Sequence, residues 1–371
     1  MEIKVNRDSL FKSISKVQSI IEKRSNMPIL SMILIRAGDK SVNISATDLE
    51  ISMQQSIEAD VLVSGSITIS GRKLFEILKE SKSQEIHLKE KENNWIFISD
   101  DKTQYNLACM PAEEYPVFVE PEDVSMVEMD CSVLTEMINK TVYAVTLEEA
   151  GYKLSGVYTE KITKEDKNML RMVSTDGHRL SLVDKSIDNL DNMKIEKGVM
   201  IPKKGLMELN KLASEGEKIS LGFKDNNCVA KNDNSLIVIR RLESKFPDYR
   251  EVISIELKNR ISIKRNNLLD GMKKMIILSS ESSRGVQITL ENNNMELVSI
   301  NPDLGDVKDN LEVEYSDEKI VLGFNSKYFV DALQAMESDD VILGFFDNSS
   351  PCMIQGEDDK GFLGLIMPMR I

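Results

Sequence analysis

The sequence has no long hydrophobic run, and this excludes a membrane-spanning helix. The longest uncharged, mostly apolar stretch is Met27–Ile35, nine residues that include Pro28 and Ser31. A helix needs about 20 consecutive apolar residues to cross a bilayer. The first eight residues alternate charged and apolar side chains and lack the apolar core of a signal peptide. We therefore expect a soluble, cytoplasmic protein.

Cysteine and histidine are scarce, which removes several kinds of functional site. No Cys-x-x-Cys pair occurs, so neither a zinc knuckle nor a disulfide framework is predicted from Cys109, Cys131, Cys228 and Cys352. The two histidines are His87 and His178. His178 lies close in sequence to an acid and a hydroxyl, but neighbours in sequence rarely converge as a catalytic triad.

Motifs of the common enzyme classes are also missing. The chain has no phosphate-binding glycine loop, no Gly-x-Ser-x-Gly elbow and no His-Glu-x-x-His. We predict no catalytic residue, no metal site and no cofactor. The protein is expected not to be an enzyme.

What the sequence does contain is a threefold internal repeat. A short alternating strand followed by a helix begins near Ile3, near Val127 and near Ile261. A strand that enters a tight polar turn recurs with Asp48, Asp176 and Pro302 at matching positions, separated by 128 and 126 residues. A second strand-to-helix step follows each turn, and such ordered recurrence indicates repeated structural units.

The repeats predict three similar α+β domains, 1–123, 124–253 and 254–371. Strands within them show the two-residue period of half-buried sheet, and helices show an apolar stripe at spacings of three and four. The order of elements suggests that each domain consists of two halves of strand, helix and three strands. Two helices packed on antiparallel sheets are expected in each domain. The six predicted helices are Arg7–Lys23, Gly71–Lys82, Asp130–Thr141, Pro202–Ala213, Arg265–Met275 and Asn325–Glu337.

Charge is unevenly distributed between the helices and the rest of the chain. The protein has 47 Lys and Arg against 61 Asp and Glu, a net charge of −14, which argues against tight binding of polyanions. The six predicted helices, however, carry 16 basic and 10 acidic residues. If they face one way, the acidic protein presents a mildly basic surface suited to sequence-independent phosphate contact.

An ordered set of motifs along the whole chain resembles the bacterial sliding clamp family, the beta subunit of DNA polymerase III. These motifs are Met27-Pro28-Ile29-Leu30, Ala46-Thr47-Asp48-Leu49-Glu50, Ser174-Thr175-Asp176-Gly177-His178-Arg179-Leu180, Phe246-Pro247-Asp248-Tyr249, Gly323-Phe324-Asn325 and Met367-Pro368-Met369-Arg370. The resemblance implies a DNA-clamp fold, with a head-to-tail homodimer forming a six-domain ring. The helices would line the hole and the sheets would lie outside.

The resemblance also implies a function and its partners. Such a ring encircles double-stranded DNA without sequence specificity and is a processivity factor of the replicative polymerase. Its partners would be the DNA polymerase III catalytic subunit, the clamp loader, and other polymerases and repair proteins that carry clamp-binding peptides.

Three sets of residues carry over by resemblance. The DNA contacts implied are Arg24, Tyr152, Lys153, Lys203 and Lys204. No contact is assigned to Glu148 and Glu149, which fill a loop where some clamps have polar or basic residues. The dimer contacts implied are Tyr105 and Leu107 against Ile277 and Leu278. The peptide pocket implied consists of Leu154, Thr175, Gly177, His178, Arg179, Leu180, Pro247, Val252, Met367, Pro368, Met369 and Arg370.

The residues alone also allow a protein of a different functional class. A monomeric, acidic scaffold of three repeat domains that binds no nucleic acid has the same composition and periodicity. The mass of the particle in solution, measured by light scattering, separates a dimer from such a monomer.

Overall fold

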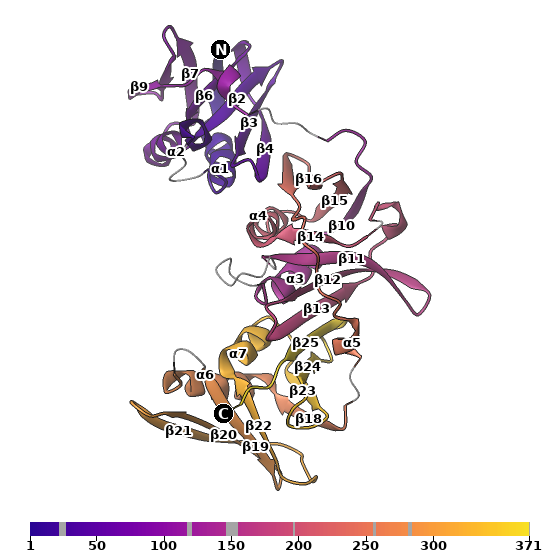
Figure 1. Ribbon diagram of the computed structural model, residues 1–371. Helices are drawn as coiled ribbons and strands as arrows, with labels where there is room; N and C mark the ends of the chain where they lie inside the picture. The colour runs from indigo at the N-terminus through magenta and orange to yellow at the C-terminus, as the bar shows by residue number, and fades with distance from the viewer. Residues whose placement is uncertain are drawn as a thin grey trace. The chain divides into compact units, whose positions relative to one another are not determined.

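The computed structural model describes residues 1–21, 27–116, 121–145, 155–195, 197–254, 257–280 and 284–370 (Figure 1). The chain divides into two compact units. The first unit comprises Met1–Ser132, Asp191–Lys194 and Lys204–Arg241, and the second comprises Val133–Leu190, Ile195–Lys203 and Leu242–Ile371. No helix in the described ranges is long and apolar enough to cross a membrane.

Three repeats of the same element order make up the chain, as the sequence predicts. The first consists of β1 (Glu2–Asn6), α1 (Arg7–Val17), β2 (Met32–Gly38), β3 (Ser41–Thr47), β4 (Ile51–Glu58), β5 (Asp60–Val63), β6 (Gly65–Ser70), α2 (Gly71–Glu80), β7 (Glu85–Lys91), β8 (Trp95–Ser99) and β9 (Gln104–Ala108). The second consists of β10 (Met126–Asp130), α3 (Cys131–Val142), β11 (Gly156–Lys164), β12 (Lys167–Thr175), β13 (Arg179–Lys185), β14 (Val199–Pro202), α4 (Lys203–Ala213), β15 (Lys218–Lys224), β16 (Asn227–Asn232) and β17 (Ser235–Arg240). After the one-turn helix α5 (Arg250–Ile253), the third consists of β18 (Asn259–Lys264), α6 (Arg265–Ile277), β19 (Gly285–Glu291), β20 (Asn294–Asn301), β21 (Gly305–Glu312), β22 (Ile320–Asn325), α7 (Ser326–Gln334), β23 (Asp340–Phe345), β24 (Cys352–Gly356) and β25 (Phe362–Ile366). Each repeat is thus two halves of strand, helix and three strands, with β5 as the one addition.

Antiparallel sheets cross from one repeat to the next. In the first unit, one sheet has the order β5-β1-β7-β8-β9 and another has the order β10-β15-β16-β17-β4-β3-β2-β6. In the second unit the orders are β14-β11-β12-β13-β25-β24-β23-β18 and β21-β20-β19-β22. The β17–β4 pair joins repeats one and two, and the β13–β25 pair joins repeats two and three. Neighbouring repeats are therefore held by backbone hydrogen bonds as well as by side chains.

Polar residues at strand ends explain where several helices begin. The Asn6 side chain accepts from the backbone N–H groups of Asp8 and Ser9, at 3.1 and 3.0 Å. The Asn325 side chain accepts from the N–H of Lys327 at 2.9 Å. Each residue ends a strand and satisfies the first free N–H groups of the following helix. The strand-to-helix step seen in the sequence is thus a local property.

The six predicted helices are present, with one clear difference in length. Helix α1 ends at Val17, six residues before the predicted end. The Ser19 hydroxyl donates to the carbonyl of Lys16 at 2.9 Å and to Glu208 at 2.5 Å. Side-chain hydrogen bonds of this kind compete with the backbone hydrogen bonds of a helix. The spacing of apolar residues, which predicted the longer helix, carries no information about them. Helix α5 was not predicted.

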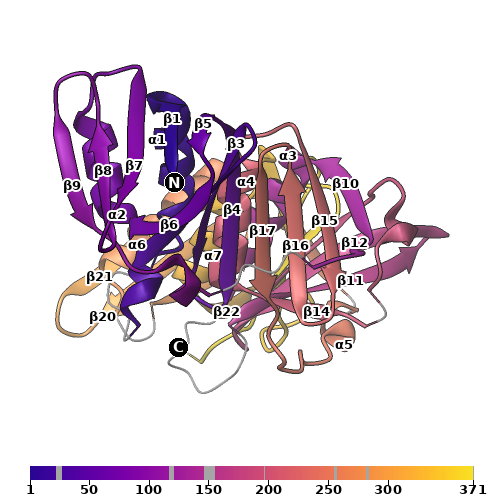
Figure 2. The same ribbon diagram turned by 90° about the horizontal axis from the view of Figure 1, so that it is seen from above.

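Two pairs of helices, α1 with α2 and α6 with α7, lie side by side over sheets of their own unit (Figures 1 and 2). In the first unit α1 packs beside α2, with the rings of Phe11 and Phe75 stacked at 5.0 Å between centroids. Leu10, Ile14 and Val17 on the other side of α1 are fully buried. In the second unit α6 packs beside α7, and their apolar faces enter a core with Phe324 and Phe329. The amphipathic stripes of the sequence therefore form the helix–sheet interfaces.

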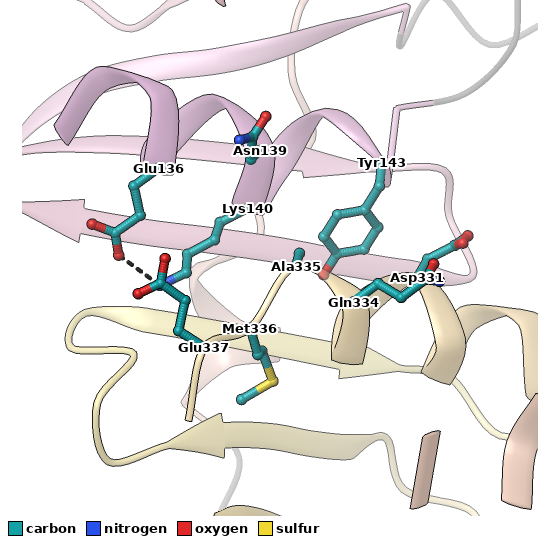
Figure 3. A pocket seen from close by; sticks show the side chains of 9 residues that line it. All are labelled: Glu136, Asn139, Lys140, Tyr143, Asp331, Gln334, Ala335, Met336 and Glu337. Carbon is teal, nitrogen blue, oxygen red and sulfur yellow. Dashed lines mark hydrogen bonds and ion pairs between the residues drawn. The ribbon is translucent and has the colours of Figure 1, made fainter. Parts of the chain in front are cut away.

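A buried lysine links the second and third repeats within the second unit. The Lys140 ammonium on α3 contacts Glu136 at 2.6 Å and Asp359 at 2.7 Å, and its side chain is 2% exposed (Figure 3 shows the Glu136 contact). Lys185 also contacts Glu136 at 2.6 Å. Burial raises the pKa values of Glu136 and Asp359, but the net effect lowers both pKa values. The hydrogen bonds from Lys140, together with those from Lys185 to Glu136 and from Ser338 and the Glu337 backbone to Asp359, outweigh burial. Both carboxylates and the lysine are therefore charged at neutral pH.

Replacing this lysine tests the buried cluster. We expect Lys140→Met to lower the free energy of unfolding by about 3–5 kcal/mol, because it leaves Asp359 buried without its cation. Chemical denaturation at pH 7 measures this. Lys264→Met is the matched control: Lys264 contacts Asp340 at 2.6 Å on the surface, and such pairs contribute little. Because the carboxyl pKa values are lowered in the folded protein, the stabilisation is complete above about pH 5 and is lost as the pH falls below the ordinary carboxyl pKa and then the lowered one. The difference in unfolding free energy between wild type and Lys140→Met should therefore be smaller in acid than at pH 7. An equal difference in acid and at pH 7 would contradict this account.

Candidate functional site

An apolar groove in the second unit is the best candidate for a binding site. Its volume is about 720 Å³. The residues that line it come from the end of β12, the start of β13 and the turn between them, the segment before α5, α5 itself, and the end of β25 with the residue after it: Thr175, Asp176, Gly177, His178, Arg179, Leu180, Lys245, Phe246, Pro247, Asp248, Tyr249, Val252, Leu365 and Met367. Two repeats thus contribute to one groove.

Most of the predicted pocket residues come together here. The eight that line the groove are Thr175, Gly177, His178, Arg179, Leu180, Pro247, Val252 and Met367. Leu154 lies outside the described residues. Six lining residues were not predicted: Asp176, Lys245, Phe246, Asp248, Tyr249 and Leu365. The segment 245–249, which forms one wall of the groove, is mostly polar in sequence. Its two aromatic residues, Phe246 and Tyr249, were the signal that could have predicted their place in the groove.

Of the predicted pocket residues at the chain end, Met367 is among the residues that line the groove, and Pro368, Met369 and Arg370 are not. The N–H of Met367 donates to the carbonyl of His178 at 2.8 Å, which holds this residue at the groove. Two residues later, the N–H of Met369 donates to the carbonyl of Gly323 on β22, also at 2.8 Å. This second bond ties the backbone at Met369 to β22.

The turn at the groove is built by short side-chain bonds. Asp176 accepts from the N–H groups of His178 and Arg179, both at 3.0 Å, and the Thr175 hydroxyl donates to the carbonyl of Arg179 at 2.6 Å. Asp48 makes the same kind of turn in the first repeat, with 2.9 and 2.7 Å bonds to the N–H groups of Glu50 and Ile51. The recurring polar turn of the sequence is therefore an Asx turn.

Arg179 anchors this turn instead of offering a free charge to a ligand. Its guanidinium contacts Asp176 at 3.0 Å and Asp331 of α7 at 2.7 Å, and lies 4.5 Å from the ring centroid of Tyr328. Burial lowers the pKa of Arg179, but the Asp331 hydrogen bond and the nearby carboxylates reverse this and the pKa is raised. The floor of the groove is apolar, since Leu180 and Leu365 belong to a buried cluster with Val173.

The predicted DNA contacts are only partly described by the structure. Arg24, Tyr152 and Lys153 lie outside the described residues, as do Glu148 and Glu149. Lys203 begins α4 and is half-buried, and its pKa is lowered by burial and by the charge of Arg179. Lys204, the next residue, forms an ion pair with Asp48.

Many other helix cations are also paired with carboxylates. Lys16 on α1 contacts Glu215 at 2.8 Å, and Lys274 on α6 contacts Asp309 on β21 at 2.8 Å. The basic excess counted along the helices is thus partly offset by acids brought close in the fold. An acidic partner several strands away is invisible to a count along the sequence.

The four predicted dimer contacts lie at element ends and edges. Tyr105 and Leu107 are half-buried on β9, an edge strand of its sheet. Ile277 ends α6 and is 72% exposed, and Leu278 follows it, half-buried. Each unit therefore presents one of the two predicted surfaces.

A second cavity, of about 400 Å³, lies between α3 and the end of α7 (Figure 3). Its lining carries both signs of charge, and the Lys140 ammonium is already paired with carboxylates. It offers neither an apolar floor nor an excess of positive charge. Within the described ranges, no group of three or more His, Cys, Asp or Glu residues is arranged to hold a metal ion.

Three α+β repeats, each of two strand–helix–three-strand halves and joined by shared sheets, are the architecture of a DNA clamp. Family models bear this out along the chain. The N-terminal, central and C-terminal domains of the DNA polymerase III beta subunit match residues 1–119, 128–248 and 250–370. The chain belongs to the DNA polymerase III beta subunit family.

Individual relatives agree over full length. The beta sliding clamps of Caulobacter vibrioides and Haemophilus influenzae are each 28% identical to this chain, with both sequences covered completely. Among solved structures, the sliding clamp of Caulobacter crescentus superposes with a TM-score of 0.94 at 27% identity, covering 100% of each chain. The Bartonella birtlesii sliding clamp bound to griselimycin gives 0.94 at 29% identity, again over both full chains.

Gly177 gives a direct test of the turn geometry. Its φ is +86°, in the region that favours glycine, and a Cβ there would meet no atom within 4 Å. We expect Gly177→Ala to cost about 1 kcal/mol of unfolding free energy from backbone strain alone. Gly38→Ala is the matched control, because Gly38 also has open space but lies outside the positive-φ region. Equal effects of the two substitutions on the unfolding free energy would argue against strain at Gly177.

Proposed function

We propose that this chain is a processivity factor of the bacterial replicative polymerase: a non-catalytic, cytoplasmic sliding clamp that tethers its partners to DNA. Membership of the beta subunit family over the whole chain is the observation that carries this proposal. Its domains would be 1–123, 124–253 and 254–371, and two copies would close a six-domain ring around the duplex.

Two exposed strand edges support ring closure by a second copy. One sheet of the first unit ends at β9, and one sheet of the second unit ends at β21. Beside β21, the exposed side chains of Ile300 and Leu304 lie in or next to its hairpin with β20. The Asn301 side-chain amide donates to the carbonyl of Ser279 just after α6, at 3.4 Å, so the hairpin lies next to the end of α6. Pairing β9 of one copy near this region of the next would cover both edges.

DNA would be held by enclosure and only weakly by charge. Arg24, Tyr152, Lys153, Lys203 and Lys204 would contact the phosphates. Lys204 already has an acidic partner, Asp48, which offsets its positive charge. Few uncompensated cations mean few released counterions, which favours sliding over tight sequence-independent binding.

The groove would receive the peptide by which partners attach. An apolar floor beside an exposed, methionine-bearing rim suits a short segment with leucine and phenylalanine side chains. The partners would be the DNA polymerase III catalytic subunit, the clamp loader, and other polymerases and repair proteins with such peptides. Because the groove lies in one chain, a monomer should bind the peptide as well as the dimer does.

Topological retention tests the proposed function. Protein loaded on nicked circular DNA should remain bound at high salt and should be lost once the circle is cut, because a ring slides off a free end. Gel filtration of labelled protein with DNA measures retention. Direct phosphate binding would fall steeply with salt on both forms, and equal retention on circular and linear DNA would contradict a clamp.

Truncating the exposed end of α6 tests the dimer. We expect Ile277→Ala and Leu278→Ala to weaken dimerisation by about 2–5 kcal/mol each if these side chains become buried at the contact. Sedimentation equilibrium measures the dimer dissociation constant. The control is Ile342→Ala, which removes another exposed isoleucine, on β23, and should leave the constant unchanged. A variant dimer as tight as the wild type would refute this placement.

Removing residues 367–371 tests the groove. The deletion takes Met367 from the lining, and we expect peptide affinity to fall by about 2 kcal/mol or more, as for an anchor residue. Fluorescence anisotropy with a labelled Gln-Leu-Ser-Leu-Phe peptide measures this, and the dimer and its melting temperature should change little. Met369→Ala is the control within the same segment and should have the smaller effect, because the N–H of Met369 bonds to Gly323 outside the groove. Undiminished affinity in the deletion variant would remove the chain end from the site.

A further inference from the structure

The wall of the groove formed by residues 245–249 has no regular secondary structure of its own. Phe246 in this segment stacks on Tyr158 of β11, with centroids 5.0 Å apart and planes at 9°. Gly198 makes room for that ring, since a Cβ there would lie 2.0 Å from it. Three residues further on, the Tyr249 side chain turns inward and is 3% exposed. The segment therefore depends on side-chain anchors for its position.

Tyr249 meets a row of charged residues that crosses three strands. Glu160 of β11 lies opposite Arg171 of β12, and Arg171 lies opposite Asp184 of β13. Arg171 holds Asp184 by two parallel bonds of 2.6 and 2.7 Å. The Tyr249 hydroxyl donates to Glu160 and accepts from Arg171 at 3.3 Å. None of the three charged residues lines the groove.

The row is a costly arrangement unless every member is satisfied. Glu160 and Asp184 are 7% and 3% exposed, and buried charges need good partners. Burial and the Glu160 hydrogen bond raise the pKa of Tyr249 to about 12, although Arg171 acts in the opposite direction, so the phenol keeps the proton that it donates. Arg250, the residue after Tyr249, adds a contact to Glu160 at 3.0 Å. Both ends of the wall segment are thus fixed to β11.

We propose that the Glu160–Arg171–Asp184 row positions Tyr249 and, through it, the groove wall, so that it sets peptide affinity without touching the peptide. This inference rests on the proposed function of the groove. The apolar cluster beneath the wall can bury the ring of Tyr249, but apolar contacts do not fix the direction in which its hydroxyl points. A directional bond to a charged acceptor supplies that constraint, and fixing the wall before binding reduces the ordering that binding would otherwise require.

Tyr249→Phe tests the row with the least disturbance, because it removes one hydroxyl and keeps the ring. We expect the dissociation constant of the labelled Gln-Leu-Ser-Leu-Phe peptide to rise about tenfold. The matched control is Tyr315→Phe, which removes another buried hydroxyl, bonded to the carbonyl of Glu318 at 2.7 Å in the third repeat. It should leave peptide affinity unchanged, even if it lowers the melting temperature as much as Tyr249→Phe does.

Two variants of the acceptor separate positioning from general stability. Glu160→Ala also removes the Arg250 contact, so it should lose at least as much affinity as Tyr249→Phe. The double variant should lose less than the sum of the two single losses, because both variants remove the bond between Tyr249 and Glu160. Glu160→Gln keeps an oxygen acceptor for the hydroxyl and should restore most of the affinity. Folded Tyr249→Phe and Glu160→Ala proteins that bind the peptide within twofold of wild type would overturn the inference. Failure of the wild type itself to bind would instead overturn the assignment of the groove, and the inference with it.

Discussion

The pairing of β13 with β25 is the contact on which the candidate site depends. It joins strands from two different repeats, and its register sets Leu180 opposite Leu365 and Arg179 opposite Ile366. The floor of the groove is therefore made by residues nearly half the chain apart, held at a fixed spacing by backbone hydrogen bonds. Met367 follows directly from β25 and is tied to His178 by one further backbone bond. A shift of β25 by one residue against β13 would place the side chain of Leu365 on the opposite face of the sheet from Leu180.

Around the junction of the second and third repeats, three basic side chains hold structural elements together. Lys140, Arg171 and Arg179 are each held by carboxylates in or near the interior. Each connects separate elements: Lys140 joins α3 to the β24–β25 turn, Arg171 joins strands to the groove wall, and Arg179 joins the β12–β13 turn to α7. Such pairs add directional constraints that apolar packing lacks, and removing one partner leaves a buried charge unpaired.

Much of the fold could be predicted because its signals are local. Strand-to-helix steps depend on a residue such as Asn6 or Asn325, whose side chain caps the helix that it precedes. The polar turns at Asp48 and Asp176 follow the same chemistry, and their recurrence revealed the repeats. The end of α1 was not predictable in this way, because it involves the bond from Ser19 to Glu208, a residue of α4. The groove wall was missed for a similar reason, since Phe246 and Tyr249 acquire their roles only from Tyr158 and Glu160.

The sequence by itself determined the three repeats, the order of strands and helices, and the family, because period, capping residues and motifs are properties of neighbouring residues. The tertiary structure alone decided which strands of different repeats pair, which cations meet carboxylates, and which member of Met367 and Met369 reaches the groove. Those outcomes depend on distances between residues that are far apart in the chain. A two-residue difference along the terminal segment changes a backbone partner from His178 to Gly323, and only the packed sheets fix that choice.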